Sequence, residues 1–219
     1  MKNKAVCIMS GGMDSAVCAF IAQSMGYDII ALHFDYQQRT MDKEKQCFNA
    51  LCDDLQVAQK IIIDADFIAQ IGGNSLTDTT LTIRENELNH QDIPNTYVPY
   101  RNGVFLSIAA AVAQRYQANA IFIGVVYEDS SGYPDCSPDF IEKINAAVNT
   151  GTGEDLTIHA PLVHLSKREI VQKALLLNVP LEHTWSCYQN QDKPCGVCDS
   201  CLLRAKGFAL ANTVDPIDL

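Results

Sequence analysis

Residues 5–18 read Ala5-Val6-Cys7-Ile8-Met9-Ser10-Gly11-Gly12-Met13-Asp14-Ser15-Ala16-Val17-Cys18. The run before the glycines is apolar and short enough to be a buried strand, and the residues after them follow an apolar helical pattern. Gly11 and Gly12 allow a tight turn that brings the backbone close to a ligand. We expect the N–H groups of Ser15, Ala16 and Val17 to lack helical acceptors, at the positive end of the helix dipole. The segment therefore predicts a strand, a glycine loop and a helix that together bind phosphate.

Neither of the best-known phosphate loops matches this segment. A Walker A loop needs Gly-Lys-Ser/Thr, and the Rossmann fingerprint needs G-x-G-x-x-G. The sequence S-G-G-M-D-S at residues 10–15 instead resembles the loop of the ATP pyrophosphatases, the PP-loop superfamily. That resemblance implies that the loop holds the β and γ phosphates of ATP, while attack on the α phosphate releases pyrophosphate. The alternative is a plain Gly-Gly turn in which Asp14 or Ser15 caps the helix.

Length and composition predict an ordinary globular protein of the cytoplasm. The chain has 219 residues, of which 47% are hydrophobic and 19% are charged. No apolar run approaches the roughly 20 residues that span a bilayer, and the N-terminus leads into a strand rather than a secretory signal. The net charge of −10 argues against extended contact with nucleic acid. We therefore expect neither a membrane nor a nucleic acid as a partner.

Strands and helices alternate along most of the chain. Besides the first strand, buried strands are predicted at residues 28–34 and 120–124, and further strands at 60–63 and 157–162. Helices are predicted at residues 41–55, 104–113, 139–148, 166–177 and 199–211. This order predicts an α/β fold with a parallel, Rossmann-like sheet and helices on both faces.

Ligands of such a sheet collect at the carboxyl ends of its strands. His33 should lie there beside the glycine loop, either touching the adenine, as this strand end does in PP-loop enzymes, or as a buried core histidine. The polar segment 72–94 is too long for a mere connection. We interpret it as a surface loop or a lid over the substrate, with disorder as the alternative.

Polar residues also surround two later helix starts. Arg101 precedes a helix, where a guanidinium can meet a phosphate or carboxylate through two hydrogen bonds, and Asn102 fits an N-cap. Glu128, Asp129 and Asp135 follow a buried strand. Beside an anion-binding loop these carboxylates would repel phosphates unless they bind Mg²⁺ or the N–H groups of a base, and the alternative is a solvated acidic loop.

Lys167 opens a helix whose Ser166 and Glu169 have capping-box spacing. A lysine at this position is either in reach of a phosphate or an ordinary surface residue. Ser137 and Pro138 start the preceding helix as N-cap and first helical residue.

Four cysteines near the C-terminus have metal-ligand spacing: Cys187, Cys195, Cys198 and Cys201. Zinc prefers tetrahedral sulfur, and gaps of two residues let thiolates converge on one ion. An iron–sulfur cluster also uses four cysteines, and free thiols or disulfides are the third possibility. Zinc with four protein ligands has no open position, so its role should be structural. We predict an ATP-binding domain over residues 1–180 and a zinc-binding helical region over residues 181–219.

Four separated motifs together resemble the 7-cyano-7-deazaguanine synthase family of queuosine biosynthesis. They are S-G-G-M-D-S at 10–15, V-P-Y-R-N at 98–102, S-G-Y-P-D-C at 131–136, and S-C-Y at 186–188 with C-G-V-C-D-S-C-L-L-R at 195–204. The resemblance covers nearly the whole chain. It implies an adenine nucleotide alpha hydrolase-like fold and a homodimer. The implied activity is that of an ATP-dependent ligase converting 7-carboxy-7-deazaguanine and ammonia into the nitrile.

The resemblance also implies site residues. ATP would be held with Mg²⁺ by Ile8, Met9, Ser10, Gly11, Gly12, Met13, Asp14, Ser15, Ala16, Val17, Cys18 and His33. The substrate would be bound by Arg101, Asn102, Glu128, Asp129, Tyr133 and Asp135. Catalysis would fall to Asp14 near Mg²⁺, Ser10 on phosphate, Arg101 on the nucleotide or substrate carboxylate, and Lys167. Zinc would be bound by the four cysteines.

One position departs from the family pattern. Many members have arginine after the cysteine of S-G-Y-P-D-C, and this chain has Ser137, so the role of that arginine is not carried over. Two other functions remain open at this point. A tRNA-thiolating PP-loop enzyme would need a basic face and a catalytic cysteine pair, and a non-catalytic nucleotide-sensing module would bind ATP without turnover.

Overall fold

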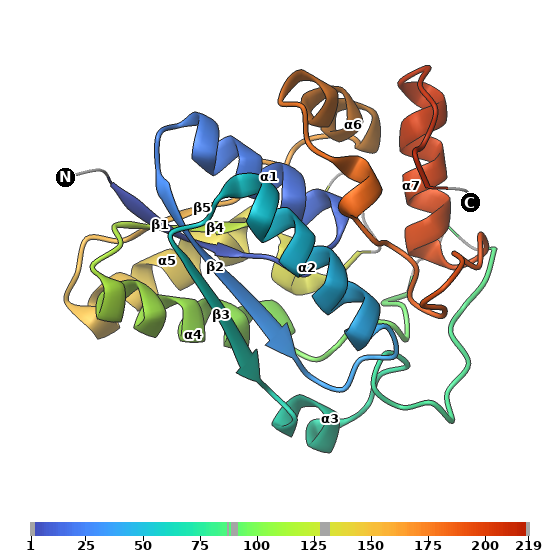
Figure 1. Cartoon of the computed structure of the whole chain (residues 1–219). Coiled ribbons are helices and arrows are strands. Elements are labelled where there is room, and N and C mark those ends of the chain that lie inside the picture. The colour runs from blue at the N-terminus through green and yellow to red at the C-terminus, as the bar shows by residue number, and fades with distance from the viewer. Residues whose placement is uncertain (1–2, 87, 89–91, 128–131, 218–219) are drawn as a thin grey trace.

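A computed structural model describes residues 3–86, 88, 92–127 and 132–217 (Figure 1). Its centre is a five-stranded, fully parallel sheet with the order β3-β2-β1-β4-β5. The strands are β1 (Lys4–Ile8), β2 (Asp28–Asp35), β3 (Gln59–Asp64), β4 (Ala120–Ile123) and β5 (Thr157–His159). The chain runs outward from β1 to β3 and then returns to β4 on the other side of β1. The carboxyl ends of β1 and β4 therefore form the switch point where doubly wound sheets bind ligands.

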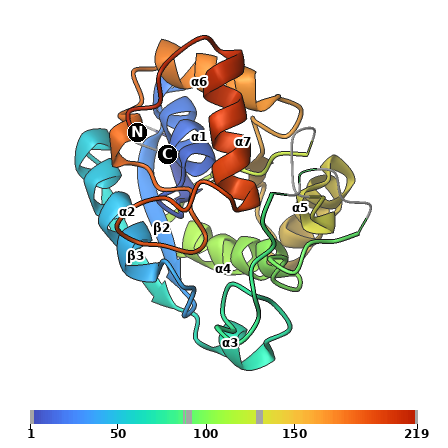
Figure 2. The ribbon, with the colours of Figure 1, turned by 90° about the vertical axis from the view of Figure 1, so that its right-hand side faces the viewer.

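Helices cover both faces of the sheet, as the alternation in the sequence predicts (Figures 1 and 2). One face carries α1 (Met13–Ser24), α2 (Met41–Leu55) and α6 (Lys167–Leu176), and the other carries α4 (Arg101–Tyr116) and α5 (Pro138–Thr152). The C-terminal helix α7 (Asp199–Leu210) packs on α6. Shorter helical segments are α3 (Phe67–Ile71), η1 (Pro134–Cys136) and η2 (Leu181–His183).

Two hydrophobic cores fill the space between the sheet and its helices. Val6 and Ile8 face the core shared with α4 and α5, whereas Ala5 and Cys7 face the core shared with α1 and α2. This division follows from the strand itself, because successive side chains point to opposite faces. Both faces of β1 are buried, which explains why its sequence is a continuous apolar run rather than an alternating one.

Most predicted boundaries agree with the structure within a few residues, and two are wrong for local reasons. The predicted strand 157–162 ends at His159, because Pro161 has no N–H to donate and Val163 N–H closes a turn on Ala160. The helix predicted from residue 104 begins three residues earlier, at Arg101, after a left-handed Tyr100. Ser137 caps α5, with its hydroxyl accepting from Phe140 N–H, as predicted.

The segment 72–94 contains no regular helix or strand among its described residues. Asn74 and Ser75 are fully buried, and the Arg39 guanidinium donates to the carbonyls of Ser75, Asp78 and Leu81. These bonds hold this part of the segment against the sheet domain. None of the helices in the described part of the chain combines the length and the apolar character that a bilayer crossing requires.

Candidate active site

The glycine loop after β1 is held between α2 and the C-terminal region. Gly11 has φ of +84°, and an added Cβ would lie 2.4 Å from the backbone oxygen of Glu44. Glycine is therefore needed here both for its backbone angle and for the close approach of α2. The Gly11 carbonyl accepts a hydrogen bond of 2.9 Å from the N–H of Trp185, which connects the loop to the C-terminal region.

Helix α1 begins earlier than the sequence pattern predicts. Gly12 occupies the N-cap position, and neither Asp14 nor Ser15 caps the helix. Ala16 N–H already donates to the Gly12 carbonyl over 3.0 Å, so the prediction that Ala16 and Val17 lack helical acceptors is wrong. The first-turn N–H groups belong instead to Met13, Asp14 and Ser15, which all line the cavity.

Two serines stabilise the shape of the loop. Ser10 N–H donates to Ser15 Oγ over 3.2 Å, and Ser15 Oγ donates to the Gly12 carbonyl over 2.9 Å. Gly12 N–H donates in turn to Ser10 Oγ over 3.2 Å. These internal hydrogen bonds preorganise the loop, which is what an anion site built from backbone N–H groups requires.

Asp14 and Lys167 form an ion pair at the cavity. Lys167 Nζ lies 2.6 Å from Asp14 Oδ2, and the side chain of Lys167 is only 8% exposed. The interpretation of Lys167 as a surface lysine is therefore wrong. The other oxygen, Asp14 Oδ1, is buried and has no hydrogen-bond partner among the described residues. A buried carboxylate oxygen without a donor is a suitable ligand for a hard cation such as Mg²⁺.

A cavity of about 240 Å³ opens at the carboxyl edge of the sheet. The glycine loop forms one side of it, and the ends of β2 and β4, the start of α4 and the C-terminal region form the others. Its lining includes Ile8, Met9, Ser10, Gly12, Met13, Asp14, Ser15, Phe34, Tyr36, Glu44, Arg101, Asn102, Phe105, Gly124, Tyr133, Cys136, Lys167, Trp185, Ser186, Tyr188, Ser200 and Leu203. Residues from widely separated segments of the sequence therefore share one cavity.

Aromatic side chains form much of the lining on the β2 side. Phe34 and Phe105 are stacked with ring centroids 3.9 Å apart. Tyr36 packs edge-on against Phe105, and its hydroxyl accepts a hydrogen bond of 3.0 Å from Arg101 Nη1. Burial raises the pKa of Tyr36 to about 12, although the charge of Arg101 opposes this rise. The cavity thus combines a fixed positive charge with flat apolar surfaces.

Asn102 and Asp135 bind each other, and Asn102 also lines the cavity. Asn102 is the second residue of α4 rather than its N-cap, and its backbone N–H donates to Asp135 Oδ2 over 2.9 Å. Its side-chain amide donates to the Asp135 carbonyl and to Cys136 Sγ, both over 3.3 Å. Asp135 therefore caps α4 from a distant part of the chain. Burial raises the pKa of this carboxyl group, against the effect of the Asn102 N–H.

His33 lies on the opposite side of β2 from the cavity. Its ring stacks on Phe48, Nδ1 lies 2.8 Å from the Met9 carbonyl, and Nε2 lies 3.2 Å from Asp35. Its neighbour Phe34 lines the cavity, because adjacent strand residues face opposite ways. His33 is not among the described residues that line the cavity. It is buried, as expected for a core histidine.

Two further predicted substrate residues, Glu128 and Asp129, lie outside the residues that the structure describes. Tyr133 does line the cavity, and its hydroxyl is 2.8 Å from Thr96 Oγ1. This contact joins the segment before α4 to the segment before η1.

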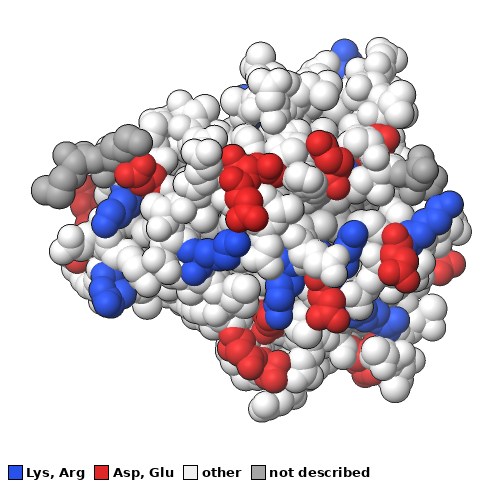
Figure 3. All heavy atoms as spheres, in the orientation of Figure 1, with Lys and Arg blue, Asp and Glu red and all other residues white. Residues whose placement is uncertain are grey.

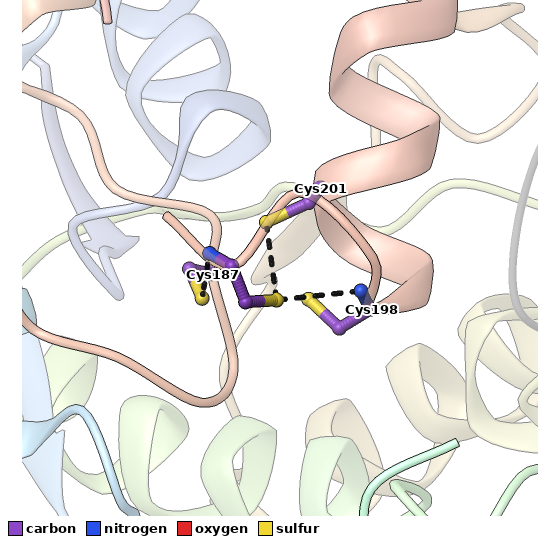
Figure 4. A group of neighbouring side chains, drawn as sticks. Cys187, Cys198 and Cys201 are labelled. Carbon is purple, nitrogen blue, oxygen red and sulfur yellow. Dashed lines mark hydrogen bonds between the residues drawn. The ribbon is translucent and has the colours of Figure 1, made fainter. Parts of the chain in front are cut away.

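The four predicted metal ligands converge in space, and three of them, Cys187, Cys198 and Cys201, are labelled in Figure 4. Their sulfur atoms all lie within 4.8 Å of one another, and those of Cys195 and Cys201 are 3.9 Å apart. Tetrahedral Zn–S bonds of about 2.3 Å separate sulfurs by about 3.8 Å, so the spacing suits one four-coordinate ion. The N–H groups of Gln189, Asn190 and Cys195 donate to Cys187 Sγ, as expected around a thiolate ligand.

The C-terminal region carries a buried ion pair that no sequence motif predicted. Arg204, only 2% exposed, donates from Nε and Nη2 to both carboxylate oxygens of Asp215 over 2.6 and 2.8 Å. Its Nη1 donates to the hydroxyls of Thr184 and Ser186. Arg204 thus fixes Ser186, a cavity residue, and the last described turn of the chain.

Comparison with known proteins agrees with this architecture. The profile of the family described as "Queuosine biosynthesis protein QueC" matches residues 4–212. The chain belongs to the QueC family. Among QueC-family relatives, the 7-cyano-7-deazaguanine synthase of Campylobacter hominis is 63% identical over 216 residues, 98% of each chain. The protein of the same name from Campylobacter jejuni subsp. jejuni is 54% identical over 220 residues, 99% of this chain and 98% of the relative.

Solved structures with low sequence identity share the fold of this QueC-family chain. A 4-thiouridine synthetase in complex with RNA and ATP has a TM-score of 0.54 at 18% identity, covering 96% of this chain and 50% of its own. The NMN synthetase of Francisella tularensis has a TM-score of 0.51 at 19% identity, covering 89% of this chain and 71% of its own. The predicted fold class is thereby confirmed.

Proposed function

We propose that this chain is an ATP-dependent carbon–nitrogen ligase that converts 7-carboxy-7-deazaguanine and ammonia into 7-cyano-7-deazaguanine. Its relatives with more than half of their residues identical carry the name of that synthase. The observation that carries the proposal is the shared cavity, in which an anion-binding glycine loop and the cationic Arg101 meet flat aromatic side chains. These are the features that a triphosphate, a carboxylate and a planar heterocycle require.

The reaction needs activation because ammonia does not attack a carboxylate that is conjugated with an electron-rich pyrrole. Adenylation of the carboxylate converts one oxygen into a leaving group and releases pyrophosphate. Ammonia then gives the amide, and a second activation of the amide oxygen followed by elimination gives the nitrile. No protein nucleophile is required, so the chain contributes positioning and charge stabilisation.

Each part of the proposed site has a role in that chemistry. The N–H groups of Met13, Asp14 and Ser15 would bind the phosphates, with Ser10 shaping the loop. Asp14 Oδ1 would hold Mg²⁺, which neutralises phosphate charge when bound. Lys167 would face the same phosphates. Arg101 would bind the substrate carboxylate, where a guanidinium can donate two parallel hydrogen bonds.

The substrate ring would lie against the aromatic lining. Tyr36, Tyr133 and Tyr188 all contribute to the cavity and offer both flat surfaces and hydroxyl groups. Asp135 enters this proposal as the residue that holds the start of α4, and thus Arg101, rather than as a direct reader of the base.

We further propose that the four cysteines bind one structural zinc ion. The spacing of their sulfurs and the donors around Cys187 support a closed tetrahedral site. Metal analysis of the purified protein, with iron measured beside zinc, tests this assignment. A homodimer in the cytoplasm also remains a prediction, which light scattering and cell fractionation would check.

The test of the activity is mass spectrometry of a reaction with purified protein, ATP, Mg²⁺, ammonium and 7-carboxy-7-deazaguanine. We expect the nitrile to appear together with AMP, and we expect Asp14→Asn to abolish turnover while preserving the circular dichroism spectrum. Consumption of ATP without nitrile, or no consumption, would overturn the substrate assignment. A tRNA would then be the next substrate to test.

A further inference from the structure

A second acidic side chain lines the cavity, and the function proposed so far gives it no role. Glu44 lies in the first turns of α2, and its backbone is the part of α2 that approaches Gly11. Among the described residues of the cavity lining, only Asp14 and Glu44 carry a carboxylate. Asp14 is paired with Lys167, so the two carboxylates are in different electrostatic situations.

The carboxylate of Glu44 is held in a fixed orientation. Oε1 accepts a hydrogen bond of 2.6 Å from Thr40 Oγ1, and Oε2 accepts one of 3.0 Å from Gln38 Nε2. Thr40 and Gln38 are themselves buried, and Gln38 is fixed by the N–H of Tyr36. A carboxylate has about four acceptor sites, so two remain for another donor after these bonds.

Glu44 has no lysine or arginine at ion-pair distance in the part of the chain that the structure describes. Arg101, which also lines the cavity, gives its hydrogen bond to Tyr36. Burial raises the pKa of Glu44, and the bonds from Thr40 and Gln38 oppose that rise. An oriented, partly desolvated carboxylate with spare acceptor sites is a site for a small cation that donates hydrogen bonds.

Tyr36 connects this site with the proposed substrate. Its hydroxyl contacts Arg101, and the charges of Arg101 and Glu44 act on its pKa in opposite directions. Tyr36, Arg101 and Glu44 all line the same cavity. An anionic reactant at Arg101 and a cationic reactant at Glu44 would therefore be held in one cavity.

We propose that Glu44 binds the ammonium ion and takes one proton from it, releasing ammonia beside the activated carboxylate. This inference rests on the proposed function. Ammonium is the prevailing form at neutral pH and has no lone pair until it loses a proton. The ammonia nitrogen then forms a bond to the carbonyl carbon. The bond from that carbon to the phosphate oxygen breaks, its electron pair leaves with AMP, and the second proton passes to solvent.

Three rates measured on the full chain separate this role from a structural one. The first is pyrophosphate exchange into ATP, dependent on 7-carboxy-7-deazaguanine and measured without ammonium, which reports adenylation alone. The second is product formation with ammonium. The third is hydroxamate formation with hydroxylamine, a nucleophile that is uncharged at neutral pH and needs no base to become reactive.

For Glu44→Gln we expect exchange and hydroxamate formation within about twofold of the unchanged chain. Product formation from ammonium should fall on the order of a hundredfold or more, the usual contribution of a positioned base. The matched control is Asp42→Asn, which removes an exposed carboxylate from the same helix turn and should leave all three rates unchanged.

Two results for Glu44→Gln would overturn the inference. Full activity with ammonium would show that the carboxylate is not needed, and an equal loss of all three rates would show that it only supports the site. If the unchanged chain gives neither exchange nor product, the proposed function itself fails and this inference fails with it. Normal exchange in Glu44→Gln therefore distinguishes the two cases.

Discussion

Replacing Gly11 by alanine tests the packing on which the proposed phosphate site depends. An added Cβ would lie 2.4 Å from the backbone oxygen of Glu44 and 3.1 Å from Cys47 Cβ. The first contact is with backbone, so a side-chain rotation cannot relieve it and α2 or the loop has to move. The variant also places a side chain on a residue with φ of +84°.

The two costs can be separated with a second glycine. Gly26 has φ of +87°, and its added Cβ would meet nothing within 4 Å. Gly26→Ala should therefore lower the free energy of unfolding only by the cost of a left-handed backbone, about 1–2 kcal/mol. This cost is reduced by about 0.4–1 kcal/mol because alanine restricts the unfolded chain. Gly11→Ala carries the same contributions and adds an overpacking cost of about 1–3 kcal/mol.

Urea unfolding followed by far-ultraviolet circular dichroism measures the difference directly. We expect Gly11→Ala to lower the free energy of unfolding by about 1–3 kcal/mol more than Gly26→Ala. We also expect it to lower ATP binding, whereas Gly26→Ala should leave binding unchanged. Equal destabilisation of the two variants would refute the close approach of α2 to the loop, and with it the account of why glycine stands at residue 11.

Three further predictions address other parts of the molecule. Lys167→Met should destabilise the fold by about 1–3 kcal/mol. This is less than the loss for a fully buried ion pair, because the side chain of Asp14 is 28% exposed. As a control, Lys143→Met, which breaks an exposed ion pair with Asp139, should leave the urea midpoint unchanged. Cys198→Ser should lose the metal and stability together, and a stable, metal-free, active variant would contradict a structural metal. Burial lowers the pKa of His159, so the unfolded chain takes up a proton more readily than the folded chain. The free energy of unfolding should therefore decrease as the pH is lowered through the usual histidine range, from about pH 7 to pH 5. In His159→Gln the part of this decrease that is due to His159 should be absent. If the urea midpoint depends on pH in the same way in the variant and in the unchanged chain, this prediction is wrong.

The fold was predictable because its signals are local. The inner strands β1, β2 and β4 are buried on both faces and appear as short apolar runs, and the glycine loop, capping box and cysteine spacing each occupy a short stretch of the chain. The helix 41–55 was predicted with its observed bounds. Such signals depend on the residue's immediate neighbours, so no knowledge of tertiary packing was needed.

The pair of Asn102 and Asp135 shows why part of the site was not predictable. Asparagine before an apolar helix fits an N-cap, and acidic residues after a strand fit a ligand site. The structure instead joins these two residues, which are 33 positions apart in the sequence. Asp135 Oδ2 accepts the hydrogen bond from the backbone N–H of Asn102, which would otherwise lack an acceptor. Nothing local in either segment specifies that partner.

His33 is a different kind of error, because the sequence held the signal. Leu32 and Phe34 belong to the core on the α4 side, so the period of two along a strand puts His33 on the other face. A histidine between those two residues cannot share a cavity with Phe34. Tyr36, at the same spacing beyond Phe34, does line the cavity and would have been found by continuing the alternation.

The C-terminal region and the glycine loop line one cavity. Ser186 and Tyr188 flank Cys187, and Ser200 stands next to Cys201, so the segments that hold the proposed metal also line the cavity. Trp185 N–H bonds to Gly11, and Arg204 fixes Ser186. A metal with a purely structural role would therefore still affect activity, since losing it would release residues that line the cavity. We expect a chain that ends at residue 180 to lack one side of the cavity, and adding residues 181–219 as a separate peptide to restore ATP binding only when metal is present.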